Sequence, residues 1–220
     1  DLHKEYRRQR QICIRDSFDT LLQLAHSFAR PKFPWLMIMH GASGSGKTYM
    51  SQAILESRDC VRIRSDAERK RLHGLCTDAQ TASDLHEGIY RQATTRATYA
   101  RLSDLAGSAL EAGWPVILDA TFLHRWERDL AFEVARRQGV PCLVVDCNAP
   151  AEVLRARVQA RSARGLDISE AGPAVLEHQL HSLTPLDSAE RTLAVVLSPS
   201  GPDDAVSQLD HALQALEGSS

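Results

Sequence analysis

The chain has 220 residues, of which 43% are hydrophobic, so it can bury one sizeable core and favours one domain, or one domain with an appendage. Its formal net charge of -2 excludes the overall basic field that dominates non-specific binding to nucleic acids, although a local basic groove is compatible with it. No apolar run approaches the about 20 residues that a membrane-spanning helix needs, and the N-terminus lacks a signal-peptide pattern, so we expect a cytoplasmic protein with no membrane partner.

The cysteines and histidines predict neither a disulfide framework nor a zinc site. The cysteines are odd in number and form no C-x-x-C pair, which fits reduced thiols that pack in the interior. The histidines show no ligand spacing with carboxylates or cysteines, and we expect His40 to be structural. The five cysteines are Cys13, Cys60, Cys76, Cys142 and Cys147.

The first predicted element is an amphipathic helix. Over residues 12–29 apolar side chains recur at helical spacing, and the sequence RPKFP at 30–34 then ends the helix. The apolar face of this helix must dock on another surface. The chain begins with Asp rather than Met, which suits a piece of a longer protein.

Beyond this helix, apolar runs alternate with helical patterns. The apolar runs predict five strands, at residues 35–39, 60–63, 115–121, 141–147 and 192–197. The helical patterns cover residues 47–57, 83–112, 124–138, 150–164, 173–183 and 203–217. The runs are apolar throughout rather than at every second residue, which favours a parallel sheet covered on both faces. We therefore predict a three-layer α/β domain.

A glycine-rich loop follows the first predicted strand. Its sequence, GASGSGKT, satisfies G-x-x-x-x-G-K-[ST] and lies between a buried strand and a helix, as a phosphate-binding loop requires. The glycines let backbone N–H groups approach the phosphates, while Lys47 reaches the β and γ phosphates and the Thr48 hydroxyl coordinates magnesium. With only 4 Lys against 22 Arg in the chain, Lys47 is not generic surface charge. We predict a nucleoside triphosphate site at Gly41, Ala42, Ser43, Gly44, Ser45, Gly46, Lys47, Thr48 and Tyr49.

Two carboxylates follow predicted strands, where ligands bind in open parallel sheets. Asp66 follows the second strand and shares one helix face with Arg69, so it could take a proton from an attacking hydroxyl while Arg69 holds the acceptor or the phosphate. A capping box of Ser65 and Glu68 is the structural alternative, and the two interpretations are compatible. Asp119 ends the third strand, where we favour a magnesium ligand over a plain turn cap.

An arginine stripe follows the fourth predicted strand. On the helix from residue 150, Arg157, Arg161 and Arg164 continue the sector that begins with apolar side chains, so its far end is expected to face anions. The sequence RSARGLDIS at 161–169 then suits a mobile lid over the phosphates. A solvated or salt-bridged arginine face is the alternative.

In this order and spacing, MHGASGSGKT, RSDAERKRL, VILDATF and RARVQARSARG resemble the AAA-type P-loop kinase domains related to zeta toxins, gluconate kinase and polynucleotide 5'-kinases. The resemblance covers about residues 35–197 and is closest to bacterial domains that follow an aminoglycoside-phosphotransferase-like domain. It implies an adenylate-kinase-like parallel sheet of five strands, with helices on both faces. The implied domains are an N-terminal helix and linker at 1–33, a kinase domain at 34–217 and a tail at 218–220.

The same resemblance implies ATP with Mg²⁺ as donor and a hydroxyl group as acceptor. It makes Lys47 and Thr48 phosphate and magnesium ligands, Asp66 the base, Arg69 the acceptor clamp and Asp119 a metal or substrate ligand. Arg157, Arg161 and Arg164 are then lid candidates. The resemblance does not name the acceptor, because members of the family differ widely in substrate.

Two other functions stay open at the level of sequence. A regulatory module would use ATP to order the segment at 161–172 and control a partner domain. A polynucleotide 5'-hydroxyl kinase is permitted by the arginine stripe, but the acidic balance and the 5% aromatic content argue against extensive base stacking.

Overall fold

In a computed structural model, the chain divides into two compact units, Asp1–Lys32 and Phe33–Ser220. The structure describes residues 33–76, 92–164, 172–196 and 202–217, together with Phe18 and Leu21. Phe18 and Leu21 are helical and exposed, and the rest of the helix predicted at 12–29 lies outside the described residues.

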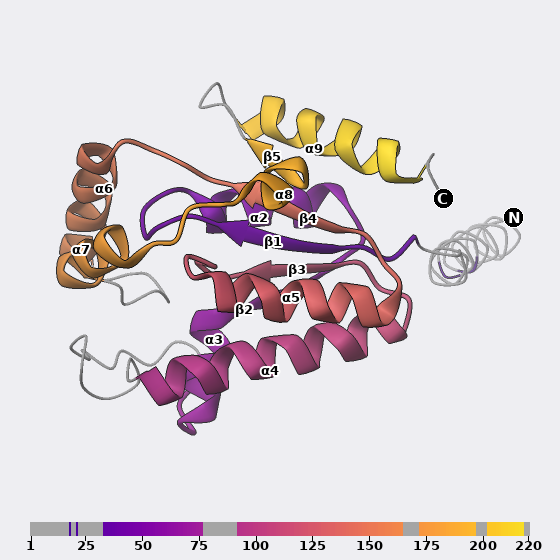
Figure 1. Ribbon diagram of the computed structural model, residues 1–220, viewed down its shortest axis with the longest axis horizontal. Helices are drawn as coiled ribbons and strands as arrows, with labels where there is room; N and C mark the ends of the chain where they lie inside the picture. Colours follow the sequence, from indigo (N-terminus) through magenta and orange to yellow (C-terminus); the bar gives the residue numbers. More distant parts are fainter. Residues whose placement is uncertain are drawn as a thin grey trace, which may run out of the picture. The chain divides into compact units, whose positions relative to one another are not determined.

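Five strands form one sheet in the order β2-β3-β1-β4-β5 (Figure 1). Every pair of neighbouring strands is parallel, as predicted. The strand that leads into the glycine-rich loop is the central one. The strands are β1 (Leu36–His40), β2 (Val61–Arg64), β3 (Val116–Asp119), β4 (Cys142–Asp146) and β5 (Ala194–Val196).

The helices connect these strands and cover both faces of the sheet. Within the described residues they are α2 (Lys47–Ser57), α3 (Ser65–Leu72), α4 (Gln92–Glu111), α5 (Arg125–Gln138), α6 (Ala151–Arg164), α7 (Pro173–Ser182), α8 (Ser188–Thr192) and α9 (Pro202–Glu217). Figure 1 shows α4 and α5 on one side of the sheet and α2 and α9 on the other. None of the described helices is both long and apolar enough to pass through a membrane.

The central strand explains why the apolar runs have no polar gaps. Side chains of a strand alternate between the two faces of the sheet. Leu36 and Ile38 enter the core under α4 and α5, while Met37 and Met39 enter the core under α2 and α9. All four are fully buried, so a polar residue at either set of positions would lie in one of the two cores.

A smaller apolar cluster joins α6 and α7 to the glycine-rich loop. It consists of Ala42 in the loop, Leu154 and Val158 on α6, and Leu176 on α7. Because these residues are buried together, the two helices pack directly on the loop.

The structure corrects the proposed capping box. Arg64 is the N-cap residue of α3, no side chain caps this helix, and Ser65 is already helical. The carboxylate of Glu68 instead pairs with Arg71 and lies 3.6 Å from Arg101 Nε. Two cationic partners are available to Glu68 outside the first turn, so it does not turn back to the start of the helix.

Two element boundaries also differ from prediction. The short helix α8 occupies residues just before and into the predicted fifth strand, and β5 begins only at Ala194. The described part of the helix predicted at 83–112 is α4, and residues 77–91 lie outside the described part of the chain.

Candidate active site

The glycine-rich loop is shaped by close backbone contacts. A Cβ atom at Gly41 would lie 2.3 Å from the carbonyl oxygen of Cys147, and the φ of Gly41 is +141°. A Cβ atom at Gly44 would lie 3.1 Å from the carbonyl oxygen of Leu154, at a φ of +83°. Both positions therefore require glycine, because any side chain would push the loop away from the strand and helix behind it.

The glycine-rich loop leads directly into the N-terminus of α2. Among the described residues no side chain caps this helix, and its first turn contains no acidic residue. The first N–H groups of a helix lack intrahelical acceptors and carry the positive end of the helix dipole. This helix start is therefore suited to bind a phosphate group.

Lys47 is buried at the base of the loop. Its Nζ donates to the carbonyl oxygen of Ala42 at 2.8 Å and lies 3.4 Å from Ser45 Oγ. Burial lowers the pKa of Lys47, and the carboxylates of Asp119 and Asp66 oppose that shift. The ammonium group is thus close enough to both carboxylates to interact with them.

Asp119 lies at the end of β3 and is also buried. Its Oδ2 atom accepts a hydrogen bond from Ser51 Oγ on α2 at 2.9 Å and lies 3.7 Å from Arg64 Nε. Ser51 Oγ is also 3.1 Å from the carbonyl oxygen of Thr48. Ser51 therefore ties the carboxylate of Asp119 to the first turn of α2, a link that the sequence analysis missed.

One cavity of about 800 Å³ contains most of the predicted site. The predicted residues that line it are Ser43, Gly44, Gly46, Lys47, Thr48, Tyr49, Asp66, Arg69, Asp119 and Arg161. Gly41, Ala42 and Ser45 belong to the same loop but do not line this cavity. The fold thus brings residues from four separate segments of the chain to one space.

Among the arginines, Arg157 and Arg161 take different positions. Arg161 lines the cavity, whereas Arg157 is exposed and donates from Nη1 to the carbonyl oxygen of Gly44 at 3.2 Å. Arg164 is the last residue of α6, and its side chain lies outside the described part of the structure.

Part of the cavity lining is aromatic and polar. The hydroxyl of Tyr99 lies 3.1 Å from Thr121 Oγ1, and its ring meets Trp126 edge-on with centroids 5.4 Å apart. Arg96 stacks over Trp126 at 5.1 Å. Burial raises the pKa of Glu127, whose Oε2 accepts from the backbone N–H of His124 at 3.1 Å.

Arg69 and Asp66, both on α3, also line the cavity. Arg69 is buried, with Nη1 3.4 Å from Thr95 Oγ1 on α4, while Asp66 is half-buried at the start of α3. Both side chains line the cavity together with the glycine-rich loop and the aromatic residues. This placement agrees with the prediction that they share one face of α3.

A side chain from α7 completes the loop. The Oε1 atom of Gln179 accepts a hydrogen bond from the backbone N–H of Ser43 at 2.8 Å. Sequence reasoning missed Gln179, although it is a polar residue between Leu176 and Leu180 on the buried face of its helix. That interruption of an apolar stripe is the signal that could have found it.

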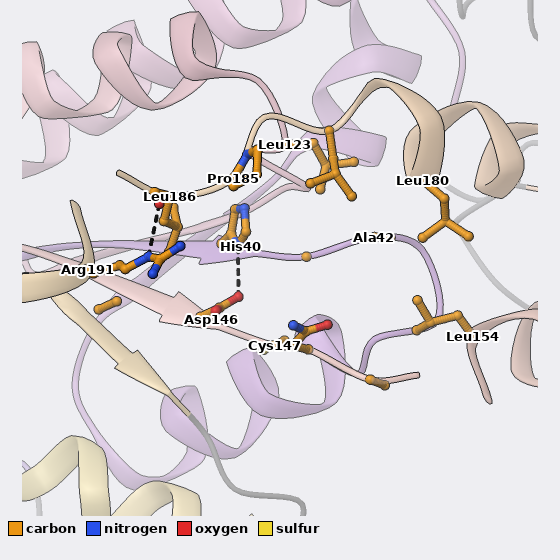
Figure 2. A pocket seen from close by; sticks show the side chains of 15 residues that line it. His40, Ala42, Leu123, Asp146, Cys147, Leu154, Leu180, Pro185, Leu186 and Arg191 are labelled. Atoms are coloured by element: carbon orange, nitrogen blue, oxygen red, sulfur yellow. Dashed lines mark hydrogen bonds and ion pairs between the residues drawn. The ribbon is translucent and has the colours of Figure 1, made fainter. Parts of the chain in front are cut away.

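A second cavity, of about 460 Å³, is lined in part by Gly41 and Ala42 of the loop (Figure 2). His40 and Asp146 are register partners at the ends of β1 and β4, and His40 Nδ1 lies 2.8 Å from Asp146 Oδ1. Most of the other side chains around them are apolar, such as Leu123, Leu154 and Leu180. This cavity contains neither Lys47 nor any of the predicted carboxylates, so the chemistry belongs to the larger one.

The larger cavity has suitable groups for a nucleotide and a magnesium ion. Magnesium prefers oxygen ligands and is commonly held by one or two protein groups together with phosphate oxygens. The hydroxyl of Thr48 and the carboxylate of Asp119 both line the cavity. In the described residues, no group of three or more His, Cys, Asp or Glu could hold a metal ion by itself.

The comparisons with known proteins agree with this geometry. A family model described as an AAA domain matches residues 36–186. Among curated proteins, none is similar enough in sequence to match the chain.

Three solved structures have a similar fold. A gluconokinase from Sinorhizobium meliloti 1021 is 22% identical over 86% of this chain and 99% of its own, with a TM-score of 0.59. The Mycobacterium tuberculosis APS kinase in complex with AMPPNP and APS is 18% identical over 84% of this chain and 99% of its own, with a TM-score of 0.60. A shikimate kinase from Acinetobacter baumannii in complex with shikimate is 18% identical over 87% of this chain and 97% of its own, with a TM-score of 0.54. These structures confirm the predicted fold, a parallel α/β sheet of the P-loop kinase type.

Proposed function

As the chain belongs to the AAA domain family and has the fold of P-loop kinases, we propose that it is an ATP-dependent phosphotransferase that acts on a hydroxyl group of a small molecule. One observation carries the proposal. The phosphate-binding loop, a carboxylate at each of two strand ends and the predicted arginines Arg69 and Arg161 line a single cavity of about 800 Å³. That volume lies within the range of small-ligand sites, roughly 300–1,000 Å³.

In this proposal the loop from Gly41 to Tyr49 binds the phosphates of ATP. Its N–H groups and the N-terminus of α2 contact phosphate oxygens, and Lys47 neutralises the charge on the β and γ phosphates. Thr48 and Asp119 would hold the magnesium ion. When bound, that ion neutralises the charge that develops on the phosphate oxygens.

The transfer step uses the two residues of α3. The acceptor oxygen attacks the γ-phosphorus of ATP, the bond from that phosphorus to the bridging oxygen breaks, and ADP leaves. Asp66 takes the proton of the acceptor hydroxyl, and Arg69 holds the acceptor. Such transfer depends on positioning and charge neutralisation more than on covalent chemistry. Arg161 on α6, with Arg157 and Arg164 as further lid candidates, would neutralise the transferring group.

The small-molecule acceptor is supported by the names of the structural neighbours. One is a gluconokinase, another was solved with APS, and a third was solved with shikimate. The aromatic and polar wall of Tyr99, Trp126 and Glu127 offers space for such an acceptor next to Asp66. The likeness to zeta toxins stays a prediction.

We also propose that residues 34–217 form the kinase domain and that it works in the cytoplasm, where ATP is available. The family match from 36 to 186 and the compact unit Phe33–Ser220 support the domain boundary. That residues 1–33 close a preceding phosphotransferase-like domain, and that 218–220 are a tail, remain predictions.

The function is tested by measuring ATP consumption with and without a pooled library of small hydroxyl compounds. The library contains sugars, nucleosides, aminoglycosides and nucleotide sugars, and the controls are Lys47→Ala and Asp66→Asn. We expect acceptor-stimulated turnover in the wild type. Asp66→Asn should abolish transfer, because the amide cannot accept the proton of the acceptor hydroxyl. ATP binding should stay nearly intact, because residue 66 lies outside the phosphate-binding loop.

Other results would redirect the proposal. Tight ATP binding without stimulation by any compound would favour a regulatory module, or a macromolecular acceptor such as a polynucleotide 5'-end. If Asp66→Asn phosphorylated an identified acceptor at the wild-type rate, Asp66 would not be the base.

A further inference from the structure

We propose that Gln179 is a further residue that binds the transferring phosphoryl group. Its Oε1 atom anchors it to the glycine-rich loop, and its Nε2 group donates a hydrogen bond to a phosphoryl oxygen. This inference rests on the proposed phosphotransferase function.

The position of Gln179 is fixed by the packing of α7. Leu176 is fully buried in the apolar cluster with Ala42, and Leu180 packs against that cluster. Residues three and four apart lie on the same face of a helix. Gln179 is three residues after Leu176 and next to Leu180, so it must face the loop rather than solvent.

The hydrogen bond to Ser43 sets the orientation of the Gln179 amide. Its partner is a backbone N–H, which can only donate, so the side-chain atom at 2.8 Å must be the oxygen. The two N–H groups of Nε2 are then directed away from this loop amide. Gln179 lines the same cavity as Lys47 and Arg161, so in this proposal Nε2 reaches a phosphoryl group bound there.

The amide of Gln179 is an uncharged hydrogen-bond donor, and such a donor in the larger cavity suits phosphoryl transfer. Charge spreads over the equatorial oxygens of the transferring group, and preorganised donors aimed at those oxygens stabilise it. Gln179 is held from both sides, by its helix and by the loop, so little reorientation is needed when the nucleotide is bound. It adds a donor without another buried charge.

A purely structural role is the competing explanation, in which Gln179 only fastens α7 to the loop. Two variants separate these roles. Gln179→Glu keeps an oxygen that can accept from Ser43 but loses both donors, and Gln179→Met keeps the length of the side chain with neither donor nor acceptor. Gln208→Glu, an exposed position on α9, is the matched control for the change in charge.

The measurement compares the affinity for ADP with the affinity for ADP plus aluminium fluoride, a planar mimic of the transferring phosphoryl group, in the presence of magnesium. Wild type and Gln208→Glu should bind ADP more tightly when aluminium fluoride is present. Both Gln179 variants should lose about 10- to 100-fold of that enhancement, while their affinity for ADP alone changes less than about threefold. Acceptor turnover, once an acceptor is known, should fall by a similar factor through kcat.

Three results would overturn the inference. Unchanged enhancement in both variants would show that Nε2 does not contact the mimic. Equal losses with and without aluminium fluoride would indicate a structural fastening only. A loss confined to Gln179→Glu would indicate repulsion by the new charge rather than a missing donor.

The same experiment separates this inference from the proposed function. If aluminium fluoride fails to enhance ADP binding even in the wild type, the phosphotransferase proposal fails and the role of Gln179 fails with it. If the wild type shows the enhancement and the variants match it, only the role of Gln179 is wrong.

Discussion

The burial of Lys47 is unfavourable for the stability of the folded protein. The side chain is 9% exposed, and burial lowers its pKa because the charged form loses its hydration. Active sites often keep such unfavourable groups, at a cost to the stability of the empty protein. The carboxylates of Asp119 and Asp66 reduce that cost without removing the shift.

We therefore expect Lys47→Met to stabilise the protein without nucleotide while it abolishes phosphate binding. The free energy of unfolding should rise by about 1 kcal/mol at neutral pH. In the wild type the unfolded chain keeps the Lys47 proton to higher pH than the folded chain, so the stability contribution of Lys47 improves as the pH rises toward 10.5. The difference in unfolding free energy between variant and wild type should thus narrow as the pH rises toward 10.5 in urea unfolding experiments. A gap that stays constant or widens would contradict this account.

Gly41 provides a second test at the scale of one residue. Gly41→Ala places a Cβ atom 2.3 Å from the backbone oxygen of Cys147, which cannot move aside as a flexible side chain could. We expect a loss of about 2 kcal/mol or more in unfolding free energy, together with a loss of nucleotide binding. The matched control is Gly107→Ala within α4, where the nearest atom, Gln138 Nε2, is 4.0 Å from the new Cβ.

That control should behave in the opposite way. Alanine is favoured over glycine inside a helix by about 0.5–1 kcal/mol, so Gly107→Ala should stabilise the protein and leave nucleotide binding unchanged. Equal effects of the two substitutions would show that the contact with Cys147 does not constrain the loop.

At this scale the sequence predicted the loop residues, the strand-end carboxylates and Arg161, and missed Ser51 and Gln179. The loop residues, Asp66 and Asp119 follow strands, and a parallel sheet places such residues at one edge. Ser51 and Gln179 reach the site only because α2 and α7 pack in particular rotations against their neighbours. Those rotations depend on tertiary contacts, which helical periodicity alone does not specify.

Among the elements, α5 is joined to the segment between α7 and α8 by a buried arginine. Arg128 is fully buried, and its guanidinium binds both oxygens of Glu190, at 2.8 and 3.1 Å. It also donates to the carbonyl oxygens of Phe122 and Leu123 at 3.1 and 3.2 Å, and to that of Thr184 at 3.1 Å. One side chain therefore holds the loop after β3 against the segment that follows α7.

Removing Arg128 should destabilise the protein strongly. Arg128→Met leaves the Glu190 carboxylate buried without its cation, which costs about 3–5 kcal/mol. Arg155→Ala, which breaks an exposed ion pair with Glu177, should lower the free energy of unfolding far less, because solvent screens that pair. Urea unfolding of both variants measures the contrast, and similar losses would show that burial does not strengthen the Arg128 network.

The sequence predicted long elements better than short ones. The helices α2 and α5 were predicted within one residue of their observed ends, because amphipathic patterns and a glycine at residue 139 mark them. The helix α8 was missed because five residues are too few to show a period, and its capping by Asp187 and Glu190 was not recognised. The following strand was consequently predicted to begin too early.

At the scale of the whole domain, the rate of cysteine alkylation reports how accessible the thiols around β4 are in the folded protein. Burial raises the pKa of Cys142 and of Cys147 to about 12, so at about pH 8 only about one thiol in ten thousand is ionised in the folded state. Both belong to the segment around β4, in the middle of the domain. Their reaction with iodoacetamide is therefore expected to be slow in the folded protein.

Among the cysteines that the structure describes, we expect Cys76, which is exposed, to be alkylated first and Cys142 and Cys147 to react slowly. Saturating nucleotide should slow the modification of Cys147 further, because a ligand that binds only the folded state lowers the population of open forms. Mass spectrometry of timed samples identifies the modified cysteine. Rapid alkylation of Cys147 in the folded protein would contradict the burial of β4.

The strand order also has a consequence for biosynthesis. The chain emerges from the ribosome with β1 and the glycine-rich loop early, but β1 lies between β3 and β4, and His40 finds its register partner Asp146 only 106 residues later. Pairings between distant residues form slowly because a long loop must close first. A nascent chain that stops before β4 would thus carry the complete phosphate-binding motif on a strand with one free edge, and the ability to hold a nucleotide would be acquired only after β4 has been made.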